Sequence, residues 1–342
     1  MKAVRKLAQG TGHVALCDVP EPDPRPGHAK IAVRAAGICG TDIHILHGGY
    51  AFNPPVTLGH EFAGEVVEVG KGVDRVRAGD RVTVLPSAMG RCGVCRFCRS
   101  GYYFYCVNRS SIGSKTDGGF ADYCVAPEDL LYVLPEGVDY RAGSLTEPLA
   151  CCVQAVCELT DIAPSDVVLI SGPGPIGMIC AALAKLRGAT VILCGTAQDR
   201  ERLGMARSFG VDRTVDVTAE DAAQVARDMT DGYGADVVLE CVGVGASVNQ
   251  CLDAAARLGR YTQVGLLDHP AQVDFGKVVY KQLRVQGALG QTWSTWEKTL
   301  RLLRRGAIDM NRFITHEVPL DRWQEAFDNT EQKRGLKNVL CP

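Results

Sequence analysis

Four cysteines are grouped in the segment GRCGVCRFCRSGYYFYC, with the spacing C-x2-C-x2-C-x7-C. Such close spacing lets one loop fold its thiolates around a single ion, and four sulfurs in a tetrahedron form a closed structural zinc site. The neighbouring Arg91, Arg96 and Arg99 would help to hold negatively charged thiolates. An iron–sulfur cluster usually has another spacing and a proline after its last cysteine, whereas Val107 follows here. Unrelated buried thiols are the remaining alternative. The predicted ligands of the structural zinc are Cys92, Cys95, Cys98 and Cys106.

A second set of possible metal ligands consists of Cys39 in AAGICGTDIH and of His60 and Glu61 in LGHEFAGEVVEVG. One thiolate, one imidazole and one carboxylate leave a tetrahedral ion with an open position, which is the arrangement of a catalytic zinc site. Taken singly, such a cysteine is more often a small buried residue, and such a His-Glu pair is more often structural. The glycines that surround them permit tight turns at both places and favour the open metal site: Gly37, Gly40, Gly59, Gly64 and Gly70.

The segment LISGPGPIG, residues 169–177, contains the pattern G-x-G-x-x-G on Gly172, Gly174 and Gly177, with Pro175 and Ile176 between the last two. The pattern follows an apolar run and opens a helical stretch. In that context the glycines permit a tight turn, close approach of the backbone to a pyrophosphate, and packing of helix against strand. Backbone amides at the helix N-terminus would then receive the phosphates, so the segment predicts a dinucleotide site.

The choice between NAD and NADP depends on the end of the next strand, VILC. An acidic residue there would bind the ribose hydroxyls of NAD, but the chain continues with Gly195 and Thr196, and the first acid is Asp199. A hydroxyl from Thr196 and a cation from Arg200 would suit the 2′-phosphate of NADP. Alternatively, Asp199 reaches back to the ribose, or Arg200 and Arg202 lie on a solvated helix face. The sequence leaves both cofactors open.

The chain has two regions of different sequence pattern, and the elements expected in them would position these residues. The first ~150 residues are rich in proline and glycine and contain short β-rich runs, which indicates a mainly β domain with long loops. From Asp166 onward, short apolar runs alternate with helical stretches such as Ile176–Arg187 and Arg200–Phe209. This alternation predicts an α/β domain with a doubly wound parallel sheet of the Rossmann type. Its six expected strands are 167–171, 190–194, 213–216, 236–240, 260–264 and 283–287.

The C-terminal part returns to a mixed pattern. Ser294 and Glu297 match a capping box, which predicts a helix from Ser294 to about Arg305, and Gly306 would end it. The three tryptophans of the chain are expected to pack in the core or an interface: Trp293, Trp296 and Trp323.

Composition excludes several classes of function. The chain has 342 residues and a net charge of −2, which gives no electrostatic footprint for nucleic acid or an anionic membrane. The longest uncharged run, Val167–Ala184, is interrupted by glycines and prolines and is not expected to span a membrane. The first residues lack the apolar region of a secretory signal, so a cytoplasmic location is expected. Fifteen cysteines would then stay reduced and available to metals.

The segments ICGTDIH and GHEFAGEVVEVG, the four-cysteine segment and GPGPIG together resemble the zinc-dependent medium-chain dehydrogenases over essentially the whole chain. Within that family the chain resembles the sorbitol (polyol) and threonine 3-dehydrogenase branches. The resemblance implies a GroES-like catalytic domain, formed by residues 1–150 and 290–342, and a Rossmann domain formed by residues 151–289. It also implies two zinc ions per chain and assembly into a homodimer or homotetramer.

The same resemblance assigns roles to individual residues. Cys39, His60 and Glu61 would bind the catalytic zinc, and Glu147, in TEPLA, would lie beside the metal and could enter its coordination shell. Thr41 and His44 match the relay that carries a proton from the alcohol to solvent. The residues expected to line the nicotinamide follow two of the later strands: Val242, Val264, Gly265 and Leu266.

The expected reaction is hydride transfer from a secondary alcohol of a polyol or sugar alcohol to NAD or NADP, with zinc as Lewis acid. A threonine-type amino-alcohol dehydrogenase is the first alternative, and a non-catalytic nucleotide-binding protein of the same fold is a remote one. The chain departs from its polyol and threonine relatives at Gln154, where they often carry a histidine, which puts details of the substrate pocket in doubt.

Overall fold

The computed structural model describes residues 1–267 and 269–342. The chain divides into two compact units. Met1–Pro148 and Gln291–Pro342 form the first, and Leu149–Gly290 form the second. Among the described residues, no helix combines the length and apolar character that crossing a membrane requires.

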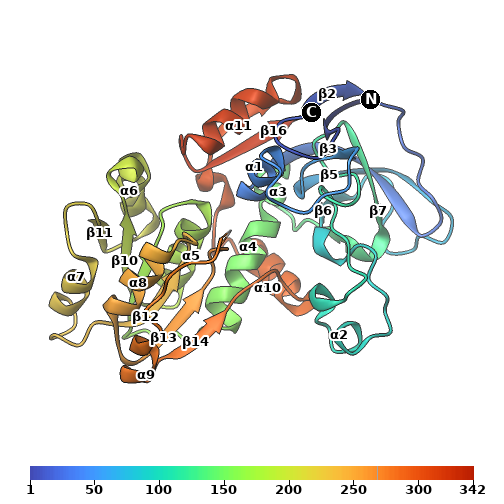
Figure 1. The fold of residues 1–342 in the computed structure, drawn as a ribbon. Coiled ribbons are helices and arrows are strands. Elements are labelled where there is room, and N and C mark those ends of the chain that lie inside the picture. Colours follow the sequence, from blue (N-terminus) through green and yellow to red (C-terminus); the bar gives the residue numbers. More distant parts are fainter. Residues whose placement is uncertain (268) are drawn as a thin grey trace. The chain divides into compact units, whose positions relative to one another are not determined.

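The second unit is built on one sheet of six parallel strands in the order β11-β10-β9-β12-β13-β14 (Figure 1). This is the strand order 3-2-1-4-5-6 of the Rossmann fold, as predicted. The two central strands, β9 and β12, are almost wholly buried, as their continuous apolar sequences require between two layers of helices. The strands span β9 (Val167–Ser171), β10 (Thr190–Gly195), β11 (Arg213–Asp216), β12 (Ala235–Glu240), β13 (Ala255–Gln263) and β14 (Arg284–Gly287).

Within the described residues, five α-helices of the second unit connect these strands. One apolar core lies beneath them, in which Leu169, Ile192 and Val238 from three neighbouring strands pack together. The helix predicted over Arg200–Phe209 ends earlier, at Ala206, and residues 207–209 form a 3-10 turn. The helices are α5 (Pro175–Leu186), α6 (Arg200–Ala206), α7 (Ala222–Asp228), α8 (Gly245–Ala254) and α9 (Gly276–Tyr280).

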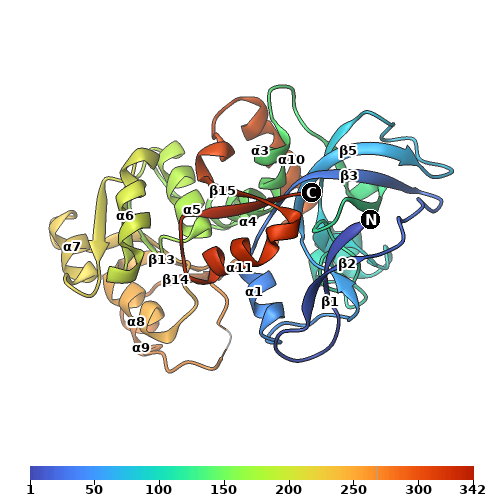
Figure 2. The same ribbon diagram turned by 90° about the horizontal axis from the view of Figure 1, so that it is seen from above.

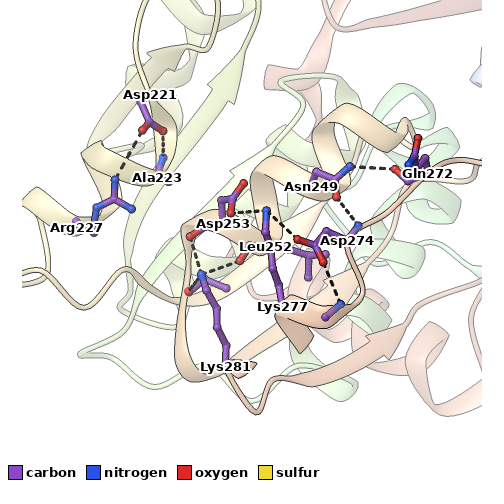
Figure 3. Close-up of polar contacts among 12 residues, drawn as sticks. Asp221, Ala223, Arg227, Asn249, Leu252, Asp253, Gln272, Asp274, Lys277 and Lys281 are labelled. Carbon is purple, nitrogen blue, oxygen red and sulfur yellow. Dashed lines mark hydrogen bonds and ion pairs between the residues drawn. The ribbon is translucent and has the colours of Figure 1, made fainter. Parts of the chain in front are cut away.

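A lysine secures the C-terminal end of α8 (Figure 3). Lys281 Nζ donates to the carbonyl oxygens of Leu252, Asp253 and Ala255 at 2.7–2.8 Å. A cation at this end complements the helix dipole and satisfies carbonyls that have no partner within the helix. Lys277, on α9, adds an ion pair to Asp253 with a 2.6 Å separation. These contacts hold α8 against α9.

The first unit is mainly β, as predicted. Its larger sheet runs in the order β15-β16-β3-β5-β6-β8, with β7 also paired to β3, and its smaller sheet runs β2-β1-β4. Both termini belong to this unit and lie close together (Figures 1 and 2). The C-terminal strand β16 pairs with β3 in the larger sheet. The strands span β1 (Lys2–Lys6), β2 (Val14–Asp18), β3 (His28–Gly37), β4 (Val56–Thr57), β5 (Glu61–Val69), β6 (Arg81–Val84), β7 (Tyr123–Pro127), β8 (Leu131–Val133), β15 (Ile314–Pro319) and β16 (Lys337–Cys341).

The remaining α-helices are α1 (Gly40–Leu46), α2 (Arg96–Arg99), α3 (Tyr140–Ser144), α4 (Thr146–Val153), α10 (Trp293–Arg304) and α11 (Trp323–Glu331). Helix α10 corrects the predicted capping box. Its N-cap is Thr292, whose hydroxyl accepts from the N–H of Thr295 at 3.2 Å, and Ser294 already lies inside the helix. Thr292 has the extended backbone that an N-cap needs, whereas a residue in the first turn cannot turn its hydroxyl onto that turn's amides. Gly306, with φ +60°, follows the helix end as expected.

Two of the three tryptophans confirm the expectation of core packing, because Trp296 and Trp323 are buried. Trp293 is partly buried and packs against Tyr103, with ring centroids 4.5 Å apart.

Candidate active site

The pairing of β3 with β5 brings the predicted ligands of the open metal site together. Gly37, near the end of β3, lies opposite Glu61, and Cys39 follows as the N-cap of α1. One ligand atom each from Cys39, His60 and Glu61 lies within 4.8 Å of the others. A Cβ on Gly37 would stand 2.4 Å from Glu61 Oε2, so only glycine leaves room for this carboxylate. Sulfur, imidazole nitrogen and carboxylate oxygen are all donors that suit Zn²⁺.

Asp42 orients two of these residues. It is fully buried in α1, and its Oδ2 accepts from the N–H of Cys39 at 2.9 Å. Its other oxygen lies 3.7 Å from His60 Nδ1, which would leave Nε2 of the imidazole for an ion. Burial lowers the pKa of His60, but the charge of Asp42 and hydrogen bonds to Asp42 and Cys39 outweigh it and raise that pKa. A carboxylate behind a ligating histidine is the usual supporting group of a zinc site.

Lys337 is a neighbour of this group that sequence reasoning missed. Its Nζ donates to Glu61 Oε2 at 2.5 Å and to the carbonyl oxygen of Ile38 at 2.7 Å, and both charged side chains are almost completely buried. Burial lowers the pKa of Lys337, but Glu61 and Cys39 outweigh it and raise that pKa. A single lysine in a C-terminal strand carries no sequence signal for such a contact.

The predicted proton relay lies on α1. Thr41 Oγ1 is 3.6 Å from Cys39 Sγ, and His44 is one helical turn further on and exposed. Glu147, in the first turn of α4, does not belong to the group of three ligand atoms. Its carboxylate accepts from Gln291 Nε2 at 3.4 Å, and a place in the coordination shell stays a prediction.

The four-cysteine segment folds as its spacing predicts. All four sulfurs lie within 4.8 Å of one another, around the short helix α2. The N–H groups of Cys95 and Cys98 donate to Cys92 Sγ and Cys95 Sγ at 3.3 and 3.5 Å. The N–H of Cys92 lowers the pKa of the Cys106 thiol to about 6. Amides directed at sulfur stabilise thiolates, so the segment fits a tetrahedral zinc ion.

One of the three arginines has another role than expected. Arg91 pairs with Asp129 and stacks over the ring of Trp293, 5.0 Å from its centroid. Arg96 lies over the neighbouring ring of Phe97. Backbone amides contact the sulfurs, while Arg91 attaches the segment to the rest of its unit.

The glycine pattern forms the turn between β9 and α5. Gly172 has φ +97°, in the left-handed region that favours glycine, and Gly174 is the N-cap of α5. A Cβ on Gly177 would lie 1.8 Å from the carbonyl oxygen of Gly172, so no other residue permits this turn. A Cβ on Gly174 would meet nothing within 4 Å, which leaves the backbone open to a ligand. The turn fits a pyrophosphate at the helix N-terminus.

After the end of β10, Asp199, the acidic residue considered for ribose binding, forms hydrogen bonds with a near neighbour in the chain. Asp199 is buried, and its Oδ2 accepts from the backbone N–H and the hydroxyl of Thr196 at 3.0 and 2.8 Å. Arg200 is exposed, whereas Arg202 is buried, so the interpretation of both arginines as a solvated face is wrong for Arg202. Burial lowers the pKa of Arg202.

The loops expected beside the nicotinamide lie together. They follow β12 and β13, which are neighbours in the sheet, so Val242 and Gly243 lie against Gly265 and Leu266. The N–H of Val264 donates to the carbonyl oxygen of Glu240 at 2.8 Å. A Cβ on Gly243 would lie 2.1 Å from the carbonyl oxygen of Leu266, and one on Gly265 would lie 2.4 Å from Gly243 N. The structure thus places these predicted residues at the carboxyl ends of the strands beside the glycine turn, where doubly wound sheets bind ligands.

Comparison with protein families gives two matches. Residues 25–136 match the alcohol dehydrogenase GroES-like domain, and residues 175–305 match the zinc-binding dehydrogenase domain. Each match lies mainly in one of the two compact units.

Full-length relatives agree with these matches. Sorbitol dehydrogenase of Halalkalibacterium halodurans is 41% identical over 343 residues, which cover 100% of this chain and 99% of that protein. L-threonine 3-dehydrogenase of Pyrococcus horikoshii is 36% identical over 96% of this chain and 94% of its own. A zinc-binding dehydrogenase from Sinorhizobium meliloti 1021, solved bound to NADP, is 34% identical and superposes with a TM-score of 0.91, covering 100% of this chain and 99% of that one. The chain therefore belongs to the zinc-dependent medium-chain dehydrogenases, in the branch of polyol and threonine dehydrogenases.

Proposed function

We propose that the protein oxidises a secondary alcohol of a polyol or sugar alcohol to a ketone, with zinc and a nicotinamide cofactor. The observation that carries this proposal is the group of Cys39, His60 and Glu61, whose ligand atoms lie within 4.8 Å of one another. When bound there, zinc supplies Lewis-acid polarisation of the substrate oxygen. Two of the three donors are not thiolates, and an oxygen-containing, exchangeable coordination shell suits a substrate with two neighbouring oxygens. The identity to a sorbitol dehydrogenase supports this substrate class.

The chain's own residues support proton release. Oxidation removes a hydride with its electron pair from the carbon and a proton from the hydroxyl. Thr41 Oγ1 can accept that proton, and the imidazole of the exposed His44 can deliver it to water. Asp42 holds His60 in position, and Lys337 balances part of the charge of Glu61.

The nucleotide site favours NADP over NAD. Strand β10 ends at Gly195 and is followed by Thr196, and the first acidic residue after it is Asp199. Asp199 is held by Thr196, and the exposed Arg200 offers a cation to a 2′-phosphate. The NADP bound to the relative from S. meliloti supports this preference.

Two zinc ions per chain and assembly into a homodimer or homotetramer complete the proposal. The two groups of ligand atoms support the metal stoichiometry. Strand β14 ends the six-stranded sheet and is exposed, which supports edge-to-edge contact between copies. The reduced thiols that both metal groups need favour a cytoplasmic location.

A threonine-type amino-alcohol dehydrogenase is the second candidate. The 36% identity to L-threonine 3-dehydrogenase of P. horikoshii favours it. That substrate would need partners for an ammonium and a carboxylate in the pocket.

The test is a panel of initial rates with NADP and NAD on sorbitol, xylitol, galactitol, inositols, threonine and simple secondary alcohols, with zinc measured on the same sample. Polyol turnover that is lost in Cys39→Ser but retained in Cys341→Ser supports the proposal, because Cys341 belongs to neither metal group. Turnover of threonine alone would move the protein to the second candidate. Binding of zinc and dinucleotide without turnover of any alcohol would contradict catalysis.

A further inference from the structure

Glu240, the last residue of β12, is a completely buried carboxylate. It accepts from the N–H of Val242 at 2.9 Å, from the N–H of Gly243 at 3.0 Å and from the hydroxyl of Ser247 at 2.6 Å. The amide Nε2 of Gln263 donates to its other side. The two backbone N–H groups can only donate, so they complement the acceptor oxygens of the carboxylate.

These hydrogen bonds join the ends of three neighbouring strands. Ser247 Oγ lies 2.7 Å from the hydroxyl of Ser171, the last residue of β9 before the glycine turn. Gln263 ends β13 and also donates to the carbonyl oxygen of Gly265 at 2.8 Å. We call Ser171, Glu240, Ser247 and Gln263 the Glu240 network. It connects the turn expected at the pyrophosphate to the two loops expected at the nicotinamide.

The charge of Glu240 has no counter-ion within the described part of the chain. No lysine, arginine or histidine there forms an ion pair with it, and only amide and hydroxyl dipoles solvate it. The N-terminal turn of α8, which contains Ser247, adds a favourable dipole. Burial and, to a smaller extent, Glu240 raise the pKa of the buried Cys251 thiol. An uncompensated charge in a low-dielectric interior acts over a longer distance than one in water.

Resting on the proposed nicotinamide site, we propose that Glu240 is a positioning residue with an electrostatic effect on the cofactor. Its carboxylate holds the Val242–Gly243 turn in place, and its charge favours the oxidised nicotinamide over the reduced one. The oxidised ring carries a positive charge and the reduced ring is neutral, so a fixed negative charge stabilises only the former. The Glu240 network thereby sets both the placement of the cofactor and the relative affinity of its two redox forms.

The test compares dissociation constants of oxidised and reduced NADP, measured by titration calorimetry and by reduced-cofactor fluorescence. Glu240→Gln keeps the size of the side chain and removes its charge. We expect its affinity for the oxidised form to fall by about tenfold, with a change of about twofold for the reduced form. Ser247→Ala keeps the charge and breaks the link to Ser171, so it should weaken both forms by the same factor. Asp228→Asn, an exposed carboxylate change on α7, serves as the matched control and should change neither affinity.

An unchanged ratio of the two affinities in Glu240→Gln would overturn the electrostatic part. Unchanged affinities in Ser247→Ala would overturn the positioning part, and this variant decides that part even if Glu240→Gln does not fold. Failure of the proposed function looks different, because zinc and dinucleotide would then bind without turnover of any alcohol. The ratio of the two affinities in Glu240→Gln could still be measured in that case.

Discussion

Lys337 Nζ lies 2.5 Å from Glu61 Oε2, although the two residues are 276 positions apart in the chain. The contact exists because β16 pairs with β3 and β3 pairs with β5, so the C-terminal strand runs near the strand that starts with Glu61. Both groups are buried, and the carboxylate that would bind a metal already has a cation as a partner. We therefore predict that Lys337 would compete with an ion for Glu61, and it compensates the charge of this carboxylate in the structure.

Replacing Lys337 with methionine should destabilise the zinc-free protein more than the zinc-loaded protein. Without the ammonium, Glu61 is a buried charge with no partner, which typically costs about 3–5 kcal/mol. In the zinc-loaded protein the carboxylate can bind the ion instead. Urea unfolding with and without a chelator measures both losses, with Lys337→Arg as the charge-retaining control. Equal losses in the two states would contradict competition for Glu61.

Cys98→Ser should reduce the zinc content by one ion per chain and lower the thermal unfolding temperature. The four-cysteine segment has little apolar core of its own, so the ion contributes most of the energy that orders it. Metal analysis and a thermal scan on the same sample check this, with Cys341→Ser as a cysteine control outside the metal groups. Loss of both ions in Cys98→Ser would show that the two sites are not independent.

Gly177→Ala should abolish dinucleotide binding, because its Cβ would lie 1.8 Å from the carbonyl oxygen of Gly172. The backbone must move, and the turn that receives the pyrophosphate moves with it. Gly204→Ala is the matched control, since a Cβ there meets nothing within 4 Å and lies inside α6. That control should raise the unfolding free energy by about 0.5–1 kcal/mol and leave binding intact. NADP titrations of both variants give the answer.

Thr292→Ala should lower the unfolding free energy by about 1 kcal/mol, because it removes the N-cap of α10. Ser294→Ala, two residues later, should cost less, since the Ser294 hydroxyl bonds only to Thr292 Oγ1, at 2.9 Å, among the contacts described for it. Urea unfolding of the two alanine variants separates them. A larger loss for Ser294→Ala would mean that the capping box predicted from the sequence is the correct one.

Asp139, the N-cap of α3, should make stability depend on acidity. Burial raises the pKa of Asp139. Hydrogen bonds from the backbone N–H of Ala142 and from the side chains of Arg141 and Asn311 outweigh burial and hold that pKa below its usual value. A lowered pKa in the folded state contributes stability at neutral pH, and that stability is lost as the pH falls through the folded pKa. Asp139→Asn should therefore destabilise the protein at pH 7 and less so in acid.

Urea unfolding between pH 3 and 8 measures this dependence, with the exposed Asp328→Asn as the control. A difference between Asp139→Asn and the unmodified protein that stays constant over this range would rule out the linkage.

Much of the fold and of the candidate site could be predicted where the relevant residues are neighbours in the chain. Three residues span at most about 10 Å, so the spacing of Cys92, Cys95 and Cys98 already brings their thiols close enough for one ion. The turn of Gly172 and Gly177 was predictable for the same reason, and continuous apolar runs identified the buried parallel strands. The prediction of the N-cap of α10 failed because Thr292 and Ser294 are chemically similar. The N-cap is the residue whose backbone is extended just before the helix, and that residue is Thr292.

Residue types and their spacing were enough to predict the metal and nucleotide groups and the class of the fold. The supporting residues around those groups emerged from the folded chain alone. The contact of Lys337 with Glu61 needs two strand pairings, and the Glu240 network needs three neighbouring strand ends in register. Residues that distant in the chain meet through packing of whole elements, and a single lysine or glutamate leaves no periodicity or spacing from which that meeting could be predicted.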